Sequence, residues 1–169
     1  MACALTRGYS IPCRDAVGGI KTVWFTELVN VTSVTTDSSG NVTAITMAAN
    51  TKFRQYDLVK ETGELTEKIT TSTPNGTVFY EQDLNFTIRK MIPIWRNEIR
   101  LLAQNLLYAV VLDANGNQWA LGVNNGLDLA PSDAKTGKAK GDFNGYELKF
   151  VGREELPMPG VTQVMSALI

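Results

Sequence analysis

The cysteines of this chain, Cys3 and Cys13, both lie within its first thirteen residues. Thiols can bind a metal, form a disulfide or act as nucleophiles. Two cysteines supply only half of a four-ligand zinc site, and the chain contains no histidine that could complete one. A disulfide is disfavoured because we expect synthesis in the reducing cytosol. We therefore interpret both cysteines as small packing groups in an N-terminal arm, and we expect no bound metal.

The lack of histidine also lowers the expectation of catalysis. Histidine is the commonest general base and the usual partner of a serine or cysteine nucleophile. Glu81 and Asp83 are two carboxylates on one face of an expected strand, but no second motif accompanies them. We interpret them as part of a solvated face, and we expect no enzymatic activity, no catalytic residues and no cofactor.

Two loop segments match ligand-binding motifs only in part. DANGN at 113–117 has the Asp-x-Asn-x-Asn order of a calcium loop, but its glycine is fourth instead of sixth and no bidentate glutamate closes it. TGKAKG at 136–141 lacks the glycine spacing and the Gly-Lys-Ser/Thr ending of a phosphate loop. The first segment is predicted to be a hairpin turn and the second a solvated loop. Lys135, Lys138 and Lys140 are candidate contacts to phosphate or a partner.

Composition indicates one domain over residues 1–169, because a chain of this length with 44% hydrophobic residues can bury a substantial core. The 16 basic and 17 acidic residues leave a net charge of −1, unlike the strongly basic footprint of a general nucleic-acid binder. No apolar run is long enough to span a bilayer, and Arg7, Arg14 and Asp15 interrupt any signal-peptide pattern. We therefore expect synthesis in the cytosol and no contact with a membrane.

The hydrophobic pattern predicts a mainly β fold. Residues 20–25 are apolar at so many positions that we expect a strand buried on both faces. Hairpins are predicted around the turns at 37–41 and 113–116, and a late strand over 146–152. The segment 153–169 is broken by proline and then apolar, and we interpret it as a C-terminal arm.

A long hairpin is predicted over 62–90, with Pro74, Asn75 and Gly76 forming its turn. In its second strand, one face carries Val78, Tyr80, Leu84, Phe86 and Ile88. The opposite face carries Thr77, Glu81, Asp83, Asn85, Thr87 and Arg89, with the apolar Phe79 as the exception. Alternation of this length indicates that one face lies in a core and the other in water or a wet channel.

The pattern changes to a helical period only once. Apolar residues recur at helical spacing in the segment after Pro93, which is well placed to begin a helix. The apolar stripe consists of Trp95, Ile99, Leu102, Ala103 and Leu106. We predict one helix over 94–106 that packs with this stripe on a sheet.

Three blocks of the sequence resemble small virion structural proteins of tailed bacteriophages, and most of all the tail tube subunit. They are MACALTRGYSIPCRDAVGGIKTVWFTE (1–27), RNEIRLLAQNLLYAVVLDANGNQWALGVNNGLDL (96–129) and GDFNGYELKFVGREELPMPGV (141–161), and together they cover about half of the chain. The resemblance implies a β-sandwich or partial barrel with one flanking helix. It also implies hexameric rings, stacked into a hollow tube of the virion through which DNA passes without specific binding.

On this resemblance, we expect the protein to be a non-enzymatic subunit whose partners are other copies and other tail proteins. The hairpin 62–90 lies outside the three blocks, but its polar face is suited to a lumen that must be wet without gripping phosphate. The residues expected to face the lumen are Glu81, Asp83, Asn85, Thr87 and Arg89. Residues 1–19, with Cys3 and Cys13, and residues 153–169 are expected to be arms that reach neighbouring rings.

Two alternatives remain open. The first is another virion component, such as a capsid decoration or head–tail connector protein. The second is a monomeric β module that binds carbohydrate or a receptor. Aromatic residues exposed at loop tips would favour that module, whereas Trp24, Trp95 and Trp119 fall inside predicted elements.

Overall fold

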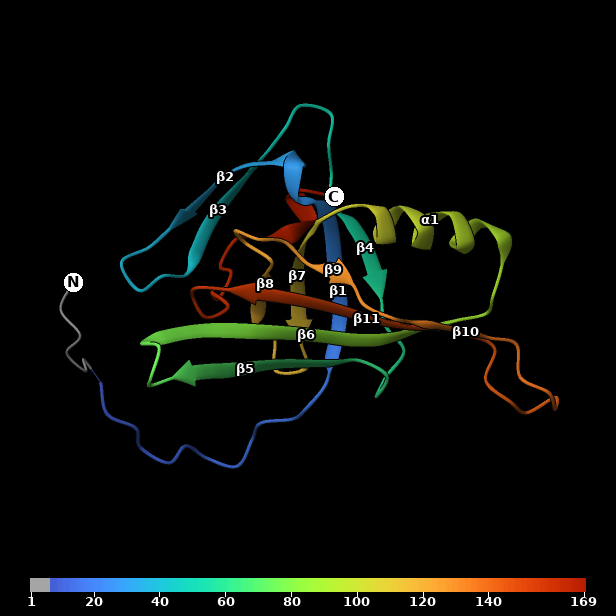
Figure 1. Cartoon of the computed structure of the whole chain (residues 1–169), viewed down its shortest axis with the longest axis horizontal. Coiled ribbons are helices and arrows are strands. Elements are labelled where there is room, and N and C mark those ends of the chain that lie inside the picture. Colours follow the sequence, from blue (N-terminus) through green and yellow to red (C-terminus); the bar gives the residue numbers. More distant parts are fainter. Residues whose placement is uncertain (1–6) are drawn as a thin grey trace.

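The computed structural model describes residues 7–169 as two antiparallel sheets, a separate hairpin and one α-helix (Figure 1). Two short 3-10 helices, η1 (Leu28–Asn30) and η2 (Met165–Ala167), complete the fold. The first sheet has the order β4 (Arg54–Asp57), β1 (Ile20–Glu27), β7 (Leu107–Asp113), β8 (Gln118–Leu121). The second sheet has the order β10 (Asp133–Lys135), β11 (Gly145–Glu154), β6 (Thr77–Arg89), β5 (Glu64–Ser72), and β9 (Asp128–Leu129) also pairs with β11. The hairpin consists of β2 (Val31–Thr36) and β3 (Val42–Met47). The predicted mainly β, sandwich-like fold with one helix is therefore confirmed.

The main core lies between the two sheets. Phe25 of β1 meets Phe86 of β6 and Phe150 of β11, with ring centroids 6.0 and 4.8 Å apart. Leu84 of β6 and Val23 of β1 are fully buried in the same cluster. Burying a side chain of this size contributes about 1.5–3 kcal/mol. These contacts fix which face of β6 looks inward.

Strand β1 is buried on both faces, as its nearly continuous apolar sequence predicts. Val23 and Phe25 face the second sheet, whereas Trp24 belongs to a second cluster on the other side. That cluster joins the first sheet to the β2–β3 hairpin and to the C-terminal segment through Ile45 and Met165. The molecule is thus three layers deep, with the first sheet in the middle.

The C-terminal segment corrects the expectation of an arm over 153–169. Its first two residues end β11, and the later part lies against the same chain. The Val161 N–H donates to the Gln118 carbonyl at 2.8 Å, and the Phe53 N–H donates to the Leu168 carbonyl at 2.9 Å. Met165 is 1% exposed. Val161 and Met165 thus cover the open face of the first sheet and are part of the core of their own subunit, whereas Leu156 and Val164 of the same segment are exposed.

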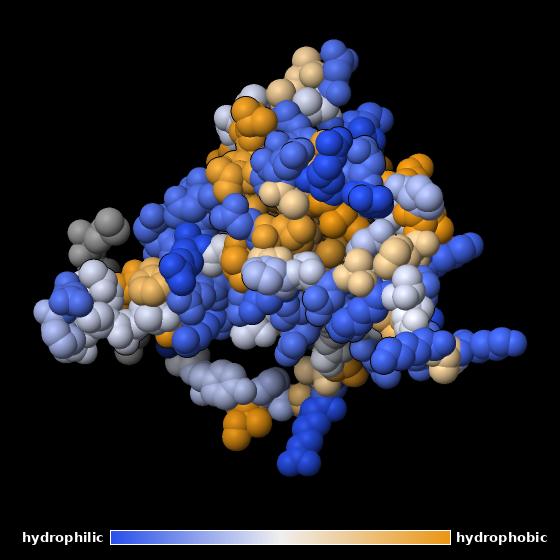
Figure 2. All heavy atoms as spheres, turned by 45° about the vertical axis from the view of Figure 1, so that its right-hand side comes forward, coloured by the Kyte–Doolittle hydropathy of each residue, from blue (hydrophilic) through white to orange (hydrophobic). Residues whose placement is uncertain are grey.

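Helix α1 (Pro93–Gln104) confirms the predicted helix within one or two residues at each end, with Pro93 in its first turn. Leu102 is buried, and Trp95 packs beside Tyr56 with ring centroids 6.4 Å apart. Ala103 and Leu106 are exposed, although the predicted stripe included them. The helix thus lies at the side of the sheets and covers little of them. Figure 2, which turns this side forward, shows apolar surface interrupted by hydrophilic side chains.

The predicted hairpins and turns are also present. The hairpin 62–90 forms β5 and β6, which run in register from Glu64 opposite Asn85 to Ser72 opposite Thr77. The calcium-like segment 113–117 is the turn between β7 and β8. No helix within residues 7–169 is long and apolar enough to cross a membrane.

Candidate functional site

All five residues expected to face a lumen lie on the outer face of the second sheet. Along β6 they alternate with residues that point into the core, namely Gln82, Leu84 and Phe86. The outward residues are Glu81, Asp83, Asn85, Thr87 and Arg89, and each is half-buried or exposed. We call the outer surface of β5, β6, β11 and β10 the polar face. The alternation in the sequence therefore assigns the two sides of β6 correctly over residues 80–89, but Val78, which was also expected in the core, is 53% exposed. The identity of a lumen stays a prediction.

The acidic residues of the polar face are paired across the strands with cations. Lys68 Nζ of β5 lies 3.5 Å from Glu81 Oε2, and Arg153 Nε of β11 lies 3.6 Å from Glu81 Oε1. Lys149 Nζ lies 3.5 Å from Asp83 Oδ2. The polar face therefore carries positive and negative side chains next to one another. The acidic residues of β6, considered without the neighbouring strands, would instead suggest a mainly acidic surface.

The same pattern continues to the far edge of this sheet. Lys135 of β10 pairs with Glu147 of β11 and with Asp133 of its own strand. All five ion pairs within residues 7–169 thus lie on the polar face. Exposed pairs contribute little to stability, typically about 0–1 kcal/mol each. Their concentration on one face therefore indicates a role in what this surface contacts and not a role in folding.

The N-terminal arm leaves the body at the start of β1. Residues 7–19 are exposed at every position, and Cys13 is a free, exposed thiol. Asn115 holds the base of the arm, because its side chain accepts from the Val17 N–H at 2.8 Å and donates to the Val17 carbonyl at 2.9 Å. Cys3 lies outside the described residues. Within residues 7–169, no group of three or more potential ligand side chains is arranged to hold a metal ion.

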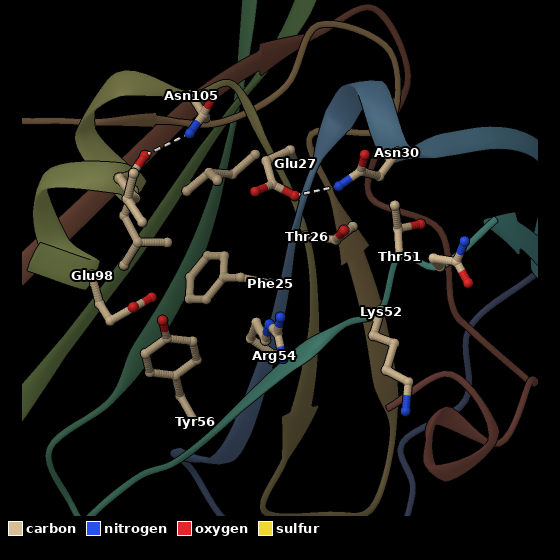
Figure 3. Close-up of a pocket in the computed structure, with 14 residues that line it drawn as sticks. Phe25, Thr26, Glu27, Asn30, Thr51, Lys52, Arg54, Tyr56, Glu98 and Asn105 are labelled. Atoms are coloured by element: carbon tan, nitrogen blue, oxygen red, sulfur yellow. Dashed lines mark hydrogen bonds between the residues drawn. The ribbon is translucent and has the colours of Figure 1, made fainter. Parts of the chain in front are cut away.

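A cleft of about 390 Å³ lies between α1 and strands β1 and β4 (Figure 3). The Tyr56 hydroxyl and the Glu98 carboxyl point toward each other across it, with Arg54 nearby. Burial, together with the negative charge of Glu98, raises the pKa of Tyr56 to about 12. At neutral pH this phenol therefore carries its proton and is not available as a base or nucleophile.

A second depression, which we call the groove, lies between the β2–β3 hairpin, strand β8 and residues 154–160. Two polar residues that point inward line it. Gln82 is 1% exposed, and its Oε1 accepts from the Gly122 N–H at 3.0 Å. Glu154 is 3% exposed, and its Oε1 accepts from the N–H groups of Asn124 and Asn125 at 3.1 and 2.9 Å.

Sequence reasoning missed both of these residues. A weak signal was present, since Gln82 stands in phase with buried Leu84 and Phe86 in an otherwise alternating strand. A polar residue at an inward position needs a partner inside the fold. The sequence places Glu154 in an expected C-terminal arm and not at the end of a strand, so its inward position is not predicted.

Comparison with protein-family models, curated proteins and solved structures finds no match for this chain.

Proposed function

We propose that this chain is a structural subunit of a tailed-bacteriophage virion, and specifically the tail tube protein. Its hexameric rings would stack around a lumen that conducts DNA, and its partners would be other copies and other tail proteins. The proposal combines the resemblance of residues 1–27, 96–129 and 141–161 to such proteins with the character of the polar face.

The observation that carries the proposal is the pairing of charges on the polar face. A surface that lines a DNA channel has to stay hydrated and must not bind phosphate strongly. Unpaired lysines or arginines along the path would attract DNA through counterion release and slow its passage. Arg89 is exposed and has no ion pair among the described residues, but Lys68, Lys149 and Arg153 each contact a carboxylate of β6. Their charge is therefore largely compensated before DNA arrives.

The edge of the second sheet supports self-assembly. Strand β5 ends the sheet, so one side of this nine-residue strand has no neighbouring strand within the described residues. Ile69 of β5 is 62% exposed, and the strand carries only a few charged residues to block pairing. Open edges of this length invite pairing with another chain. Closure of a ring would satisfy them in every subunit.

The position of the tryptophans does not favour a carbohydrate-binding module. Trp24 is 7% exposed, and Trp95 and Trp119 are half-buried within the fold. A sugar-binding surface would be expected to present such rings to solvent. Other virion components remain the alternatives that an assembly experiment separates from a tube.

The test is negative-stain imaging with light scattering over a wide range of protein concentration, alongside analysis of virions. We expect rings and tubes. The variant Ile69→Lys, which places a charge on the β5 edge, should block them, while Ile94→Lys on α1 should not, although the two residues are similarly exposed at 62% and 66%. A protein that is monomeric at all concentrations and absent from virions would exclude this function. Presence in virions without tubes would indicate a decoration or connector protein.

A further inference from the structure

The groove has the features of a site for an extended peptide. Its cavity volume is about 510 Å³, in the range of ligand-binding pockets. Its lining is largely apolar and includes Val34, Trp119, Leu156 and Met158. Leu156 is 66% exposed, so part of this lining is open to solvent in the isolated subunit.

One hydrogen-bonding position in the groove is unfilled. Glu154 is the one charged residue that lines it, and its Oε1 already accepts two backbone N–H groups. Its other oxygen, Oε2, is buried and has no hydrogen-bond partner in the described part of the chain. Buried carboxyl oxygens are nearly always paired, and a cationic donor makes the strongest partner. A guanidinium could supply the missing donor, but because Oε2 is buried, side chains that cover it have to move aside first.

The N-terminal arm has the complementary features. Tyr9 is 86% exposed and Ile11 is 90% exposed, and Arg7 and Arg14 flank them. Pro12 favours an extended backbone at the residue before it. Figure 1 shows the arm running clear of both sheets. Residues 7–19 can reach up to about 45 Å when fully extended, at about 3.4 Å per residue.

We propose that the groove receives the N-terminal arm of a second copy of this chain. Tyr9 and Ile11 of the arriving arm pack against the apolar lining. The side chains that cover Glu154 Oε2 move aside, and Arg7 or Arg14 donates to this unpaired oxygen. The bound arm covers Leu156, and its own apolar residues are buried in the contact. This inference rests on the self-assembly contained in the proposed function, but it does not require that the assembly be a tube.

The test is cross-linking between two marked chains, both carrying Cys3→Ser. The first chain keeps Cys13 in its arm. The second carries Cys13→Ser and Ser39→Cys, since Ser39 is an exposed residue of the groove. The matched control replaces Ser39→Cys with Ala139→Cys, an exposed position in the loop at the far end of the second sheet (Figure 1). A thiol cross-linker is added to the mixed, assembled protein, and the linked peptides are identified by mass spectrometry.

We expect Cys13 of one chain to link to position 39 of the other at least about tenfold more than to position 139. Glu154→Gln in the second chain should lower the yield by about tenfold, as expected when one charge-assisted hydrogen bond is lost. Arg7→Ala with Arg14→Ala in the first chain should do the same. These last changes lie in an exposed arm, so they test the contact even where Glu154→Gln impairs folding.

The remaining outcomes separate this inference from the proposed function. Equal linkage to positions 39 and 139, or no linkage of Cys13 to position 39, would overturn the docking of a second copy. Rings or tubes without the 13–39 link would also overturn it while leaving the proposed function intact. The link without any rings or tubes would support the docking and count against the tube.

Discussion

Asp113 accepts hydrogen bonds from both the backbone N–H and the side-chain amide of Asn117, at 2.8 and 3.0 Å. Asp37 makes the same two contacts with Asn41, at 2.9 and 3.2 Å. In each turn a glycine with positive φ precedes the asparagine. Both short hairpins are therefore closed by a turn of the same Asp-x-x-Gly-Asn type. In each turn the aspartate carboxylate accepts a hydrogen bond from a backbone N–H.

The first prediction concerns this turn. Asp113 also accepts from Trp119 Nε1 at 3.2 Å, so Asp113→Ala removes three hydrogen bonds to a carboxylate. We expect the free energy of unfolding to fall by about 1.5–3 kcal/mol, the scale of hydrogen bonds to charged groups. The control Asp133→Ala breaks only an exposed ion pair with Lys135 and should change stability by less than about 1 kcal/mol. Urea unfolding measures both, and equal losses would show that the turn contacts add nothing.

The second prediction is a loss of stability in acid. Hydrogen bonds from the Asn41 backbone and side chain lower the pKa of Asp37, and those from Ala139 and Lys138 lower the pKa of Asp142. Burial opposes ionisation of Asp113, but its hydrogen bonds from Asn117 and Trp119 outweigh this and also lower its pKa. In each case the folded pKa lies below the ordinary value of 3.8.

Groups of this kind stabilise the folded protein at pH values above their unfolded pKa, and the stabilisation is lost as the pH falls through the folded pKa. We therefore expect the melting temperature to be steady from pH 7 to about pH 5 and to fall below about pH 4. Asp113→Ala should show a shallower fall than the wild type. An identical acid slope for both proteins would contradict a role of this carboxyl in the pH dependence.

The elements predicted well from the sequence are those fixed by local chemistry. The alternation around Leu84 and Phe86 sets the two faces of β6, and Pro93 marks the start of α1. The position of the C-terminal segment was not predictable in this way. Its proline-broken sequence shows no period, and only the open face of the first sheet determines that Met165 is buried. Pairing of Glu154 with the turn at Asn124 likewise depends on a contact distant in sequence.

The third prediction compares two glycines that both have positive φ, +64° at Gly122 and +91° at Gly116. A Cβ at Gly116 would meet open space, so Gly116→Ala should cost about 1–2 kcal/mol for the left-handed backbone alone. A Cβ at Gly122 would lie 2.8 Å from the Leu107 carbonyl oxygen and from the Leu127 backbone nitrogen. Gly122→Ala should therefore cost about 1–3 kcal/mol more, because backbone atoms have to move. Thermal unfolding of the two variants tests this, and equal costs would contradict the close approach.

The fourth prediction concerns the cysteines. Replacement of Cys3 and Cys13 together by serine should change the free energy of unfolding by less than about 0.5 kcal/mol, because we interpret both thiols as packing groups of an arm that folding does not need. Cys13 is exposed and forms no disulfide. Denaturant unfolding is the measurement, and elemental analysis of both proteins is its companion. Stoichiometric zinc in the wild type that disappears in the double variant would show that the arm binds metal.

The last prediction concerns the polar face. Glu81→Lys with Asp83→Lys places two new cations per subunit next to Lys68, Lys149 and Arg153, which lose their carboxylate partners. The inward residues of β6 are untouched and the affected pairs are partly exposed, so folding and assembly should persist with a loss of about 1–2 kcal/mol. If this face lines the channel, the new cations repeat around every ring along the path of the DNA. Attraction through counterion release should then slow DNA passage and lower infectivity, most strongly at low salt.

The matched control is Glu81→Gln with Asp83→Asn, which removes the same ion pairs without adding cations. Tube formation by microscopy and DNA ejection by phage carrying each variant are measured together. We expect normal tubes in both, with slow, salt-dependent ejection only in the lysine variant, because only there does the polar face gain new positive groups. Normal ejection by the lysine variant with intact tubes would mean that these residues do not face the lumen. Loss of tubes in both variants would mean that the ion pairs of Glu81 and Asp83 belong to a contact between subunits.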